Sequence, residues 1–209
     1  WGYKDQEIFS KEELIELFDI ERVHKTSAVF DMDKLNWLNS HYINQSSIER
    51  LYSLTKPFLE NSYPQYLELE KTPAGKEKIN NIINCLKERM KTIKEIVELS
   101  DFFFLDEINY NKEAVEKHLK AEGVLLILAN LRAALSNISD FNKENIESSF
   151  RNLAKDMGIK AGAVIHPARV ALTGRSDSPP MFDTVEIIGK ETSIKRLDSV
   201  LNKLNNNLL

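Results

Sequence analysis

Cysteine is nearly absent from this sequence of 209 residues, since Cys85 stands alone. One thiol can form neither an internal disulfide nor a zinc site of several cysteines, and it is typical of a reducing compartment, so we expect a cytoplasmic protein. The four histidines show no paired spacing of the kind that binds metals. We therefore expect no metal site.

Glycine and proline are scarce as well, with seven and six residues respectively. This composition, rich in leucine, isoleucine, glutamate and lysine, favours helices over turn-rich sheets. No apolar run reaches the roughly 18 residues of a membrane span. The longest, within residues 123–135, is interrupted by Asn130 and Arg132 and predicts a buried helix. We expect no membrane partner.

The chain also lacks an excess of positive charge. Its 28 lysines and arginines face 32 aspartates and glutamates, for a formal net charge of −4. This balance argues against a strong sequence-independent nucleic-acid binder, and we expect no DNA partner. It still permits a local basic surface, because salt screens charges beyond about 10 Å.

Helix-start signals recur along the chain, each followed by apolar residues spaced by three and four. Three pairs have the spacing of capping boxes, and the other starts carry an Asp, Asn or Thr-Pro cap. These signals are Ser10/Glu13, Ser46/Glu49, Thr92/Glu95, Asp31, Asn111, Asn142 and Thr72-Pro73.

The second half predicts helices over 111–123, 123–135, 142–158, 160–172, 180–189 and 192–204, with a frayed tail at 205–207. No segment alternates as strands do, so we predict an all-α fold of helical bundles in tandem. Helix propensity is weakest over 61–71 and 102–110, which we expect to be hinges between bundles.

No arrangement of residues indicates an active site. Cys85 lies among Ile82, Ile83 and Leu86, which predicts a buried, inert thiol. The acidic pairs lie at helix starts, where they complement the helix dipole. There is no glycine-rich phosphate loop, so we expect no catalytic residue and no cofactor in this chain.

Basic residues concentrate in one segment. Arg151, Lys155, Lys160, Arg169 and Arg175 are opposed by Asp156 alone. The loop that follows, 176–182, combines small hydroxyls and two prolines with Met181 and Phe182, a mixture that can hold unstacked RNA bases. The alternatives are a solvated helix face for the basic residues and core packing for Phe182.

A second basic cluster contains Lys87, Arg89, Lys91 and Lys94, just before and after Thr92. An arginine at such a helix junction can present a bidentate fork to a single base. A surface ion pair of Arg89 with Glu88 or Glu95 is the alternative.

Several motifs, in order, resemble bacterial-type glutamyl-tRNA synthetases. The first region extends from Ile8-Phe9-Ser10 through Arg22-Val23 to Lys34-Leu35-Asn36-Trp37, and Glu88-Arg89-Met90-Lys91-Thr92-Ile93 is the clearest match in the middle. The last comprises residues 165–174, 178–182 and 188–191. Pro180 stands where that family commonly has glycine, and Ser178 where it often has threonine.

The resemblance implies three parts: 1–44 would finish a stem-contact fold, and 45–110 and 111–209 would be two anticodon-binding helical subdomains. It implies that Arg89 senses the third anticodon base, that Ser178, Pro179 and Met181 read the first two, and that Arg169 contacts a base. Phe182 belongs to the same loop, and Lys91 and Arg175 would add basic contacts.

The HIGH and KMSKS-type signatures of that family are absent, so we expect this chain to bind glutamate tRNA without forming glutamyl-adenylate. The parent enzyme would be a glutamate–tRNA ligase that uses ATP and Mg, and Trp1 in place of Met leads us to expect a fragment or processed product of it. We also expect a monomer. The alternative is a helical protein-interaction scaffold with no RNA role. Whether the parent would also charge glutamine tRNA, and whether it is bacterial or organellar, both stay open.

Overall fold

The computed structural model describes residues 1–4, 6–25, 27, 29–206 and 208. Helices account for most of this part of the chain, and it contains no named strand, so the predicted all-α class is confirmed. None of its helices is both long and apolar enough to cross a membrane.

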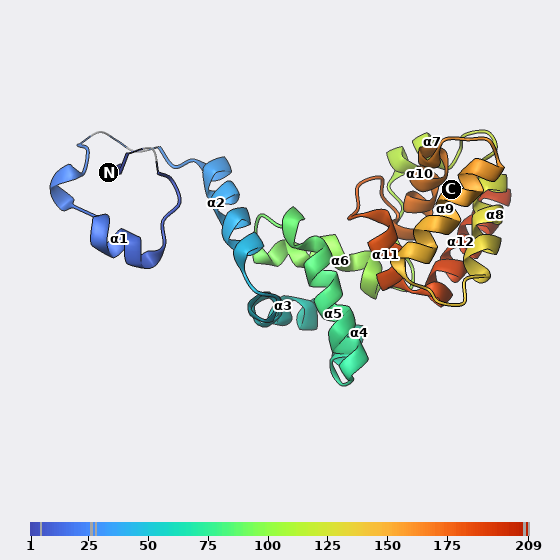
Figure 1. Ribbon diagram of the computed structural model, residues 1–209, viewed down its shortest axis with the longest axis horizontal. Coiled ribbons are helices and arrows are strands. Elements are labelled where there is room, and N and C mark those ends of the chain that lie inside the picture. Colours follow the sequence, from blue (N-terminus) through green and yellow to red (C-terminus); the bar gives the residue numbers. More distant parts are fainter. Residues whose placement is uncertain (5, 26, 28, 207, 209) are drawn as a thin grey trace.

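The helices follow one another in three groups (Figure 1). The N-terminal segment holds α1 (Lys11–Leu17) and the short 3-10 helix η1 (Ile20–Arg22). The middle group comprises α2 (Met32–Gln45), α3 (Ile48–Ser62), α4 (Pro64–Glu70), α5 (Pro73–Leu86), η2 (Lys87–Arg89), η3 (Ile93–Glu95) and α6 (Ile96–Phe104). The C-terminal group comprises α7 (Lys112–His118), α8 (Val124–Ser136), α9 (Lys143–Asp156), α10 (Ala161–Thr173), α11 (Met181–Ile188) and α12 (Lys190–Asn205).

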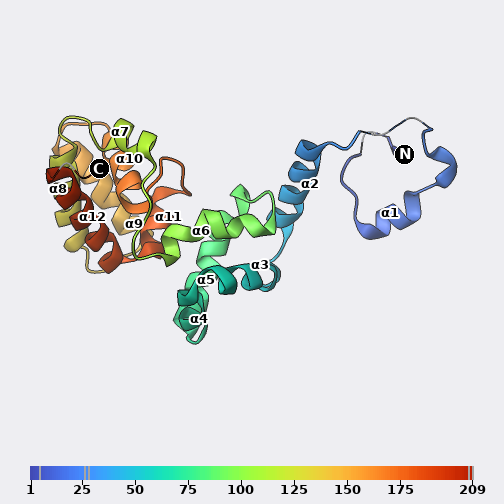
Figure 2. The same ribbon diagram turned by 180° about the vertical axis from the view of Figure 1, so that it is seen from behind.

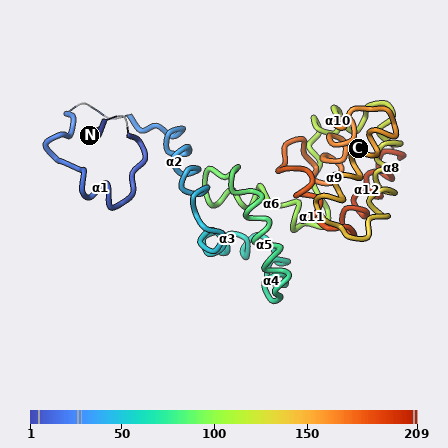
Figure 3. The backbone as a smooth tube through the Cα atoms, in the orientation of Figure 1, coloured from blue at the N-terminus to red at the C-terminus, as the bar shows by residue number. Residues whose placement is uncertain are grey.

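The molecule is elongated, with the middle group between the other two in both views (Figures 1 and 2). After α6 the chain enters the C-terminal group and stays there (Figure 3). One buried apolar cluster runs through the middle and C-terminal groups, from Ile43 to Val200. The domain boundaries at 44/45 and 110/111 stay predictions.

Most predicted helix starts are confirmed, because capping is local. The Ser10/Glu13 box forms, Asp31 and Asn142 accept bonds from the first turns of α2 and α9, and the Thr72 hydroxyl accepts the amide of Gly75. The predicted Ser46 cap is wrong by one residue. The hydroxyl of Ser46 donates to the Tyr42 carbonyl at the end of α2, and Ser47 caps α3 instead.

The expected hinge over 61–71 is also wrong, because that segment forms α4. Pro64 occupies the first turn of α4, where the missing amide hydrogen costs nothing, and Tyr66 is fully buried beside Phe104. A side chain at position 75 would lie 2.0 Å from the carbonyl oxygen of Leu69, so Gly75 allows α5 to pack closely on α4.

Three other boundaries differ from the prediction. The helix that starts after Asn111 ends at His118 rather than near Gly123. Leu119 is buried, and Gly123, at φ +79°, is the N-cap that directly precedes α8. The last helix starts at Lys190, two residues early, directly after Gly189. In the expected frayed tail, Asn205 is helical and Asn207 lies outside the described residues.

The buried guanidinium of Arg196 joins the middle group to the C-terminal group. Its Nη2 donates to the carbonyls of Phe102 and Leu105 at the end of α6, both at 2.8 Å, and its Nη1 donates to Leu172 near the end of α10 at 2.7 Å. Carbonyls at helix C-termini lack partners within the helix and carry partial negative charge. Arg196 therefore holds the ends of these two helices together.

The connection over 105–111 is also fixed against the end of α10. The hydroxyl of Tyr110 donates to the Ala171 carbonyl, and the amide of Asn111 donates to that of Gly174 at 2.8 Å. Gly174 has φ +78°, and a Cβ there would lie 2.1 Å from the Asn109 carbonyl oxygen. Only glycine fits this position without a shift of the backbone.

We expect Gly174→Ala to lower the free energy of unfolding by clearly more than 1 kcal/mol, because strain at positive φ adds to a backbone clash. Chemical denaturation measures the loss. Gly158→Ala is the matched control, since Gly158 also has positive φ (+66°) but no atom lies within 4 Å of its added Cβ. Equal losses in the two variants would contradict the close approach to Asn109.

We expect Arg196→Met to lower the free energy of unfolding by about 3 kcal/mol, because three buried carbonyls lose their donor. Arg132→Met is the control, since Arg132 also bonds to α12, through Asp198, but in a solvent-exposed pair. Thermal or chemical unfolding should show a much smaller loss for Arg132→Met. A loss at Arg196 no greater than at Arg132 would contradict the role of Arg196 as the junction between groups.

Candidate nucleic-acid interface

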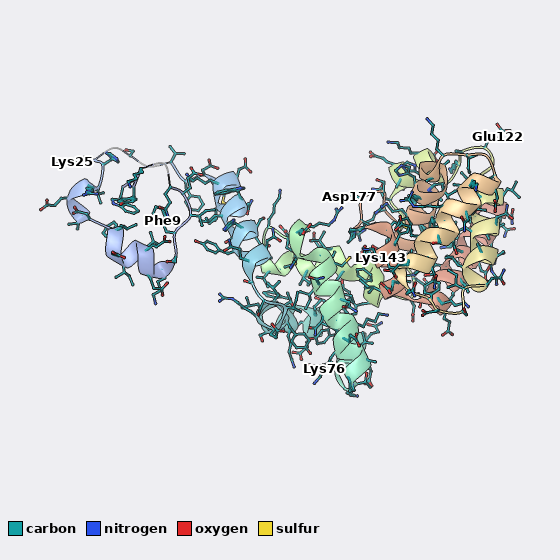
Figure 4. All side chains as sticks on the ribbon, viewed as in Figure 1. Phe9, Lys25, Lys76, Glu122, Lys143 and Asp177 are labelled. Atoms are coloured by element: carbon teal, nitrogen blue, oxygen red, sulfur yellow. The ribbon has the colours of Figure 1, made fainter. Side chains whose placement is uncertain are left out.

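A cleft of about 400 Å³ opens where the middle and C-terminal groups meet. Its walls come from the end of α5 with η2, from α6, from α7 and from the loop after α10. The lining residues are Leu86, Arg89, Leu99, Phe102, Asn111, Glu113, Ala114, Lys117 and the loop residues 175–179. Figure 4 shows Asp177 on the side of the C-terminal group that faces the middle group. The structure thus brings Arg89 and the predicted base-reading loop to one place.

Arg89 ends η2, and its side chain is exposed at the mouth of the cleft. Its Nη1 lies 2.6 Å from Oδ1 of Asp177, 88 residues away in the chain. The ion-pair partner of Arg89 is therefore Asp177 and neither Glu88 nor Glu95. The Glu95 carboxylate instead accepts the backbone amides of Lys91 and Thr92, at 2.7 and 3.3 Å. The side chain of Lys91 is exposed next to this junction.

Arg169, on α10, sets the shape of the loop. Its Nη1 donates to the carbonyls of Ser178 and Pro179, at 3.0 and 2.8 Å, and also contacts the Ser178 hydroxyl. Partial burial lowers the pKa of Arg169, and the nearby charge of Arg89 lowers it further. Arg169 does not itself line the cleft, but it holds two loop residues that do, Ser178 and Pro179.

The loop presents less apolar surface than its composition indicates. Ser178, Pro179 and Met181 are buried, whereas Pro180 is exposed. Phe182 packs edge-on against Phe150, with the ring centroids 5.5 Å apart. The expectation that Met181 contributes to a surface is wrong, because its side chain is buried. Phe182 is partly buried and packs against the core with part of its ring exposed, so both interpretations of Phe182 stay predictions. Ser178, Pro179 and Met181 instead determine the course of the backbone.

Arg175 connects the loop to α6. Its Nη1 donates to the Glu98 carbonyl at 3.1 Å, it forms an ion pair with Asp101, and its guanidinium carbon lies 5.3 Å from the centre of the Phe102 ring. These contacts use the charge of Arg175 within the protein. Arg175, which we expected to add a basic contact to RNA, therefore mainly bridges the middle and C-terminal groups.

The other basic residues predicted between 151 and 175 do not line the cleft; these are Arg151, Lys155 and Lys160. Arg151 pairs with Glu147 on its own helix at 2.6 Å. His166 stacks on His118, with the ring centroids 5.3 Å apart. Of the basic segment 151–175, only residues 169–175 contribute to the site. Arg151 lies on a solvated helix face, which was the alternative interpretation.

Several lining residues had no signal in the sequence. Lys117 and Glu113 lie on α7, a helix of seven residues whose charges look like those of any exposed helix. Leu99 and Phe102 come from α6. Their position at the cleft depends on how the two groups dock, which local patterns do not encode.

Cys85 is half-buried on α5, beside a second cleft that α11 also lines. Burial raises the pKa of its thiol to about 11, and the charge of Asp183 acts in the same direction. A thiol with this pKa is protonated at neutral pH, which fits an unreactive side chain. Within the described residues, no group of three histidine, cysteine, aspartate or glutamate side chains is placed to hold a metal ion.

Residues 50–201 match the family described as "Anticodon binding domain". The chain is 39% identical over 201 residues to a glutamate–tRNA ligase of Thermodesulfovibrio yellowstonii, covering 96% of this chain and 42% of that protein. It is 37% identical to the glutamate–tRNA ligase of Bacillus subtilis, covering 94% of this chain and 40% of that protein.

The fold agrees with these matches. A crystal structure of a glutamate tRNA ligase from Elizabethkingia meningosepticum superposes with a TM-score of 0.82 and 31% identity, over 95% of this chain and 38% of that one. This chain thus spans about two fifths of the length of the relatives it matches. The resemblance to glutamyl-tRNA synthetases is confirmed, and the chain belongs to the anticodon binding domain family.

Proposed function

We propose that this chain is the part of a glutamate–tRNA ligase that recognises the anticodon of glutamate tRNA. The observation that carries the proposal is the convergence, on one cleft, of Arg89 from the middle group with the 176–179 loop of the C-terminal group. Arg169 holds this loop through the carbonyls of Ser178 and Pro179. An anticodon has three unpaired bases within a short distance, so one RNA loop can touch both walls.

The chemistry of the cleft suits unpaired nucleotides. Arginines donate to phosphates and base edges, and a guanidinium plane also stacks on bases. Leu99 is partly exposed and supplies an apolar part of the wall. The net charge of −4 is no obstacle, because the positive groups are gathered at one position and distant charges are screened.

We assign third-base recognition to Arg89, which is exposed, whereas Arg169 and Arg175 are partly buried. Arg169 would hold the loop in the shape that presents its backbone and Ser178, Pro179 and Met181 to the first two bases. Contact of a base with the buried side chains of Ser178 or Met181 would require the loop to open by a small rearrangement. Lys91 would contribute charge near the phosphates.

The ligation itself belongs, in this proposal, to a catalytic domain outside this chain, with ATP and Mg as its requirements. The present chain carries neither of the two ATP-binding signatures of that family. We further propose that it acts as a monomer in the cytoplasm.

Salt dependence of binding tests the proposal as a whole. Neutralisation of phosphates releases counterions, so the affinity for glutamate tRNA should fall steeply as salt rises. A filter-binding titration at low and moderate salt measures this. Undetectable or salt-independent binding would contradict the proposal and favour the helical scaffold.

Arg89→Ala should weaken binding of glutamate tRNA and reduce discrimination at the third anticodon base by about 1–3 kcal/mol, the range for bidentate base readout. The measurement compares cognate tRNA with tRNA altered at that base. Arg151→Ala removes an arginine of the same type outside the cleft and should change neither quantity. If Arg89→Ala behaved like the parent on both tRNAs, the role assigned to Arg89 would be wrong.

A further inference from the structure

Asp177 is the side chain placed most directly against Arg89. The two groups meet through a single contact, Nη1 to Oδ1 at 2.6 Å, and their side chains are 36% and 86% exposed respectively. Within the described part of the chain, Nε and Nη2 of Arg89 and Oδ2 of Asp177 have no further hydrogen bond or ion pair. The pair therefore offers several donors and an acceptor side by side at the mouth of the cleft.

This pair contributes little to holding the two groups together. Asp177 is largely in water and Arg89 is about one third exposed, and an ion pair with such access to solvent is weak and easily opened. Arg196 and Arg175 already join the groups through buried or half-buried contacts. Asp177 is thus available to a ligand, and its carboxylate is an unusual feature in a cleft for a polyanion.

A carboxylate beside a guanidinium matches one kind of base edge. The arginine donates to acceptor atoms, and the carboxylate accepts from an exocyclic amino group. Cytosine has this combination on its pairing edge, with two acceptors next to its amino group. Uracil has the same size but carries a carbonyl oxygen in place of the amino group, and that oxygen would face the carboxylate. Its ring nitrogen carries a hydrogen, which would face the donors of the arginine.

We propose that Asp177 is a specificity-determining residue that reads one unpaired base jointly with Arg89, favouring cytosine over uracil. Arg89 donates to the ring nitrogen and carbonyl of the base, and Asp177 accepts from its amino group. The inference rests on the proposed function, since it concerns the same cleft. It goes further in assigning the acidic partner and the base that this partner selects.

The contribution of Asp177 is mostly a penalty against the wrong base. A site built to accept a hydrogen bond rejects a ligand that lacks the donor, because two lone pairs then face each other. Loss of the carboxylate should therefore improve binding of uracil more than it weakens binding of cytosine. Loss of Arg89 should instead weaken binding of cytosine most, because Arg89 donates to both acceptors of its pairing edge.

The test uses the 209-residue chain and two anticodon stem-loop RNAs that differ only by cytosine or uracil at the third anticodon position. Fluorescence anisotropy at fixed salt gives the ratio of the two dissociation constants. We expect Asp177→Ala to reduce this ratio by about tenfold, the scale of one base-edge contact. Asp177→Glu keeps an acceptor and should retain most of the preference.

Glu122→Gln is the control for the change in net charge, because Glu122 is exposed at the far end of the C-terminal group from Asp177 (Figure 4). It should leave the ratio unchanged. Thermal unfolding checks that Asp177→Ala remains folded, as expected for a side chain this exposed.

An unchanged ratio in Asp177→Ala, with the parent chain still preferring cytosine, would overturn the inference and leave the proposed function intact. So would an equal gain in affinity for both RNAs, since Asp177 would then only repel phosphates. Failure of the parent chain to bind either RNA would overturn the proposed function together with this inference.

Discussion

The arrangement of the cleft depends on the buried guanidinium of Arg196. A charged group away from water is costly unless hydrogen bonds replace its hydration, and three backbone carbonyls from two helix ends accept from Nη1 and Nη2 of Arg196. Those carbonyls are the groups that a helix leaves without partners at its C-terminus. The junction therefore gives the guanidinium hydrogen-bond acceptors and gives the carbonyls a donor. It also places the end of α6 against the end of α10.

Three arginines near this junction have different roles because their surroundings differ. Arg169 is half-buried and bonds to the backbone of the loop, Arg175 bridges to α6, and Arg89 is exposed and faces a single carboxylate. A planar fork with five donors can make several directed bonds at once, which a lysine cannot. The first two arginines shape the cleft, and the third is left for a ligand.

The N-terminal segment shows how far local interactions alone define structure. α1 contains no buried residue, and the side chain of Ile15 in this helix is exposed. Val29 and Phe30, which follow α1 in the chain, are exposed as well. The start of α1 is nevertheless where the Ser10/Glu13 pair predicts it. Local capping, and not packing, therefore sets the start of α1. The helix α4 differs, because its residue Tyr66 is fully buried in the core.

The sequence by itself determined the all-α class and most helix starts, because caps act over three or four residues and apolar spacing is local. It failed by one residue at Ser46, where either of two adjacent hydroxyls could cap, and at 61–71, where weak propensity was overridden by packing.

Only the tertiary structure decided which side chains share the cleft. Arg89 meets Asp177 across 88 residues of chain, the contribution of Lys117 depends on the docking of α7, and burial of Met181 depends on how α11 packs against α9, α12 and α5. These are contacts between elements distant in the chain, fixed by the summed packing of both groups, and no local pattern of residues carries that information.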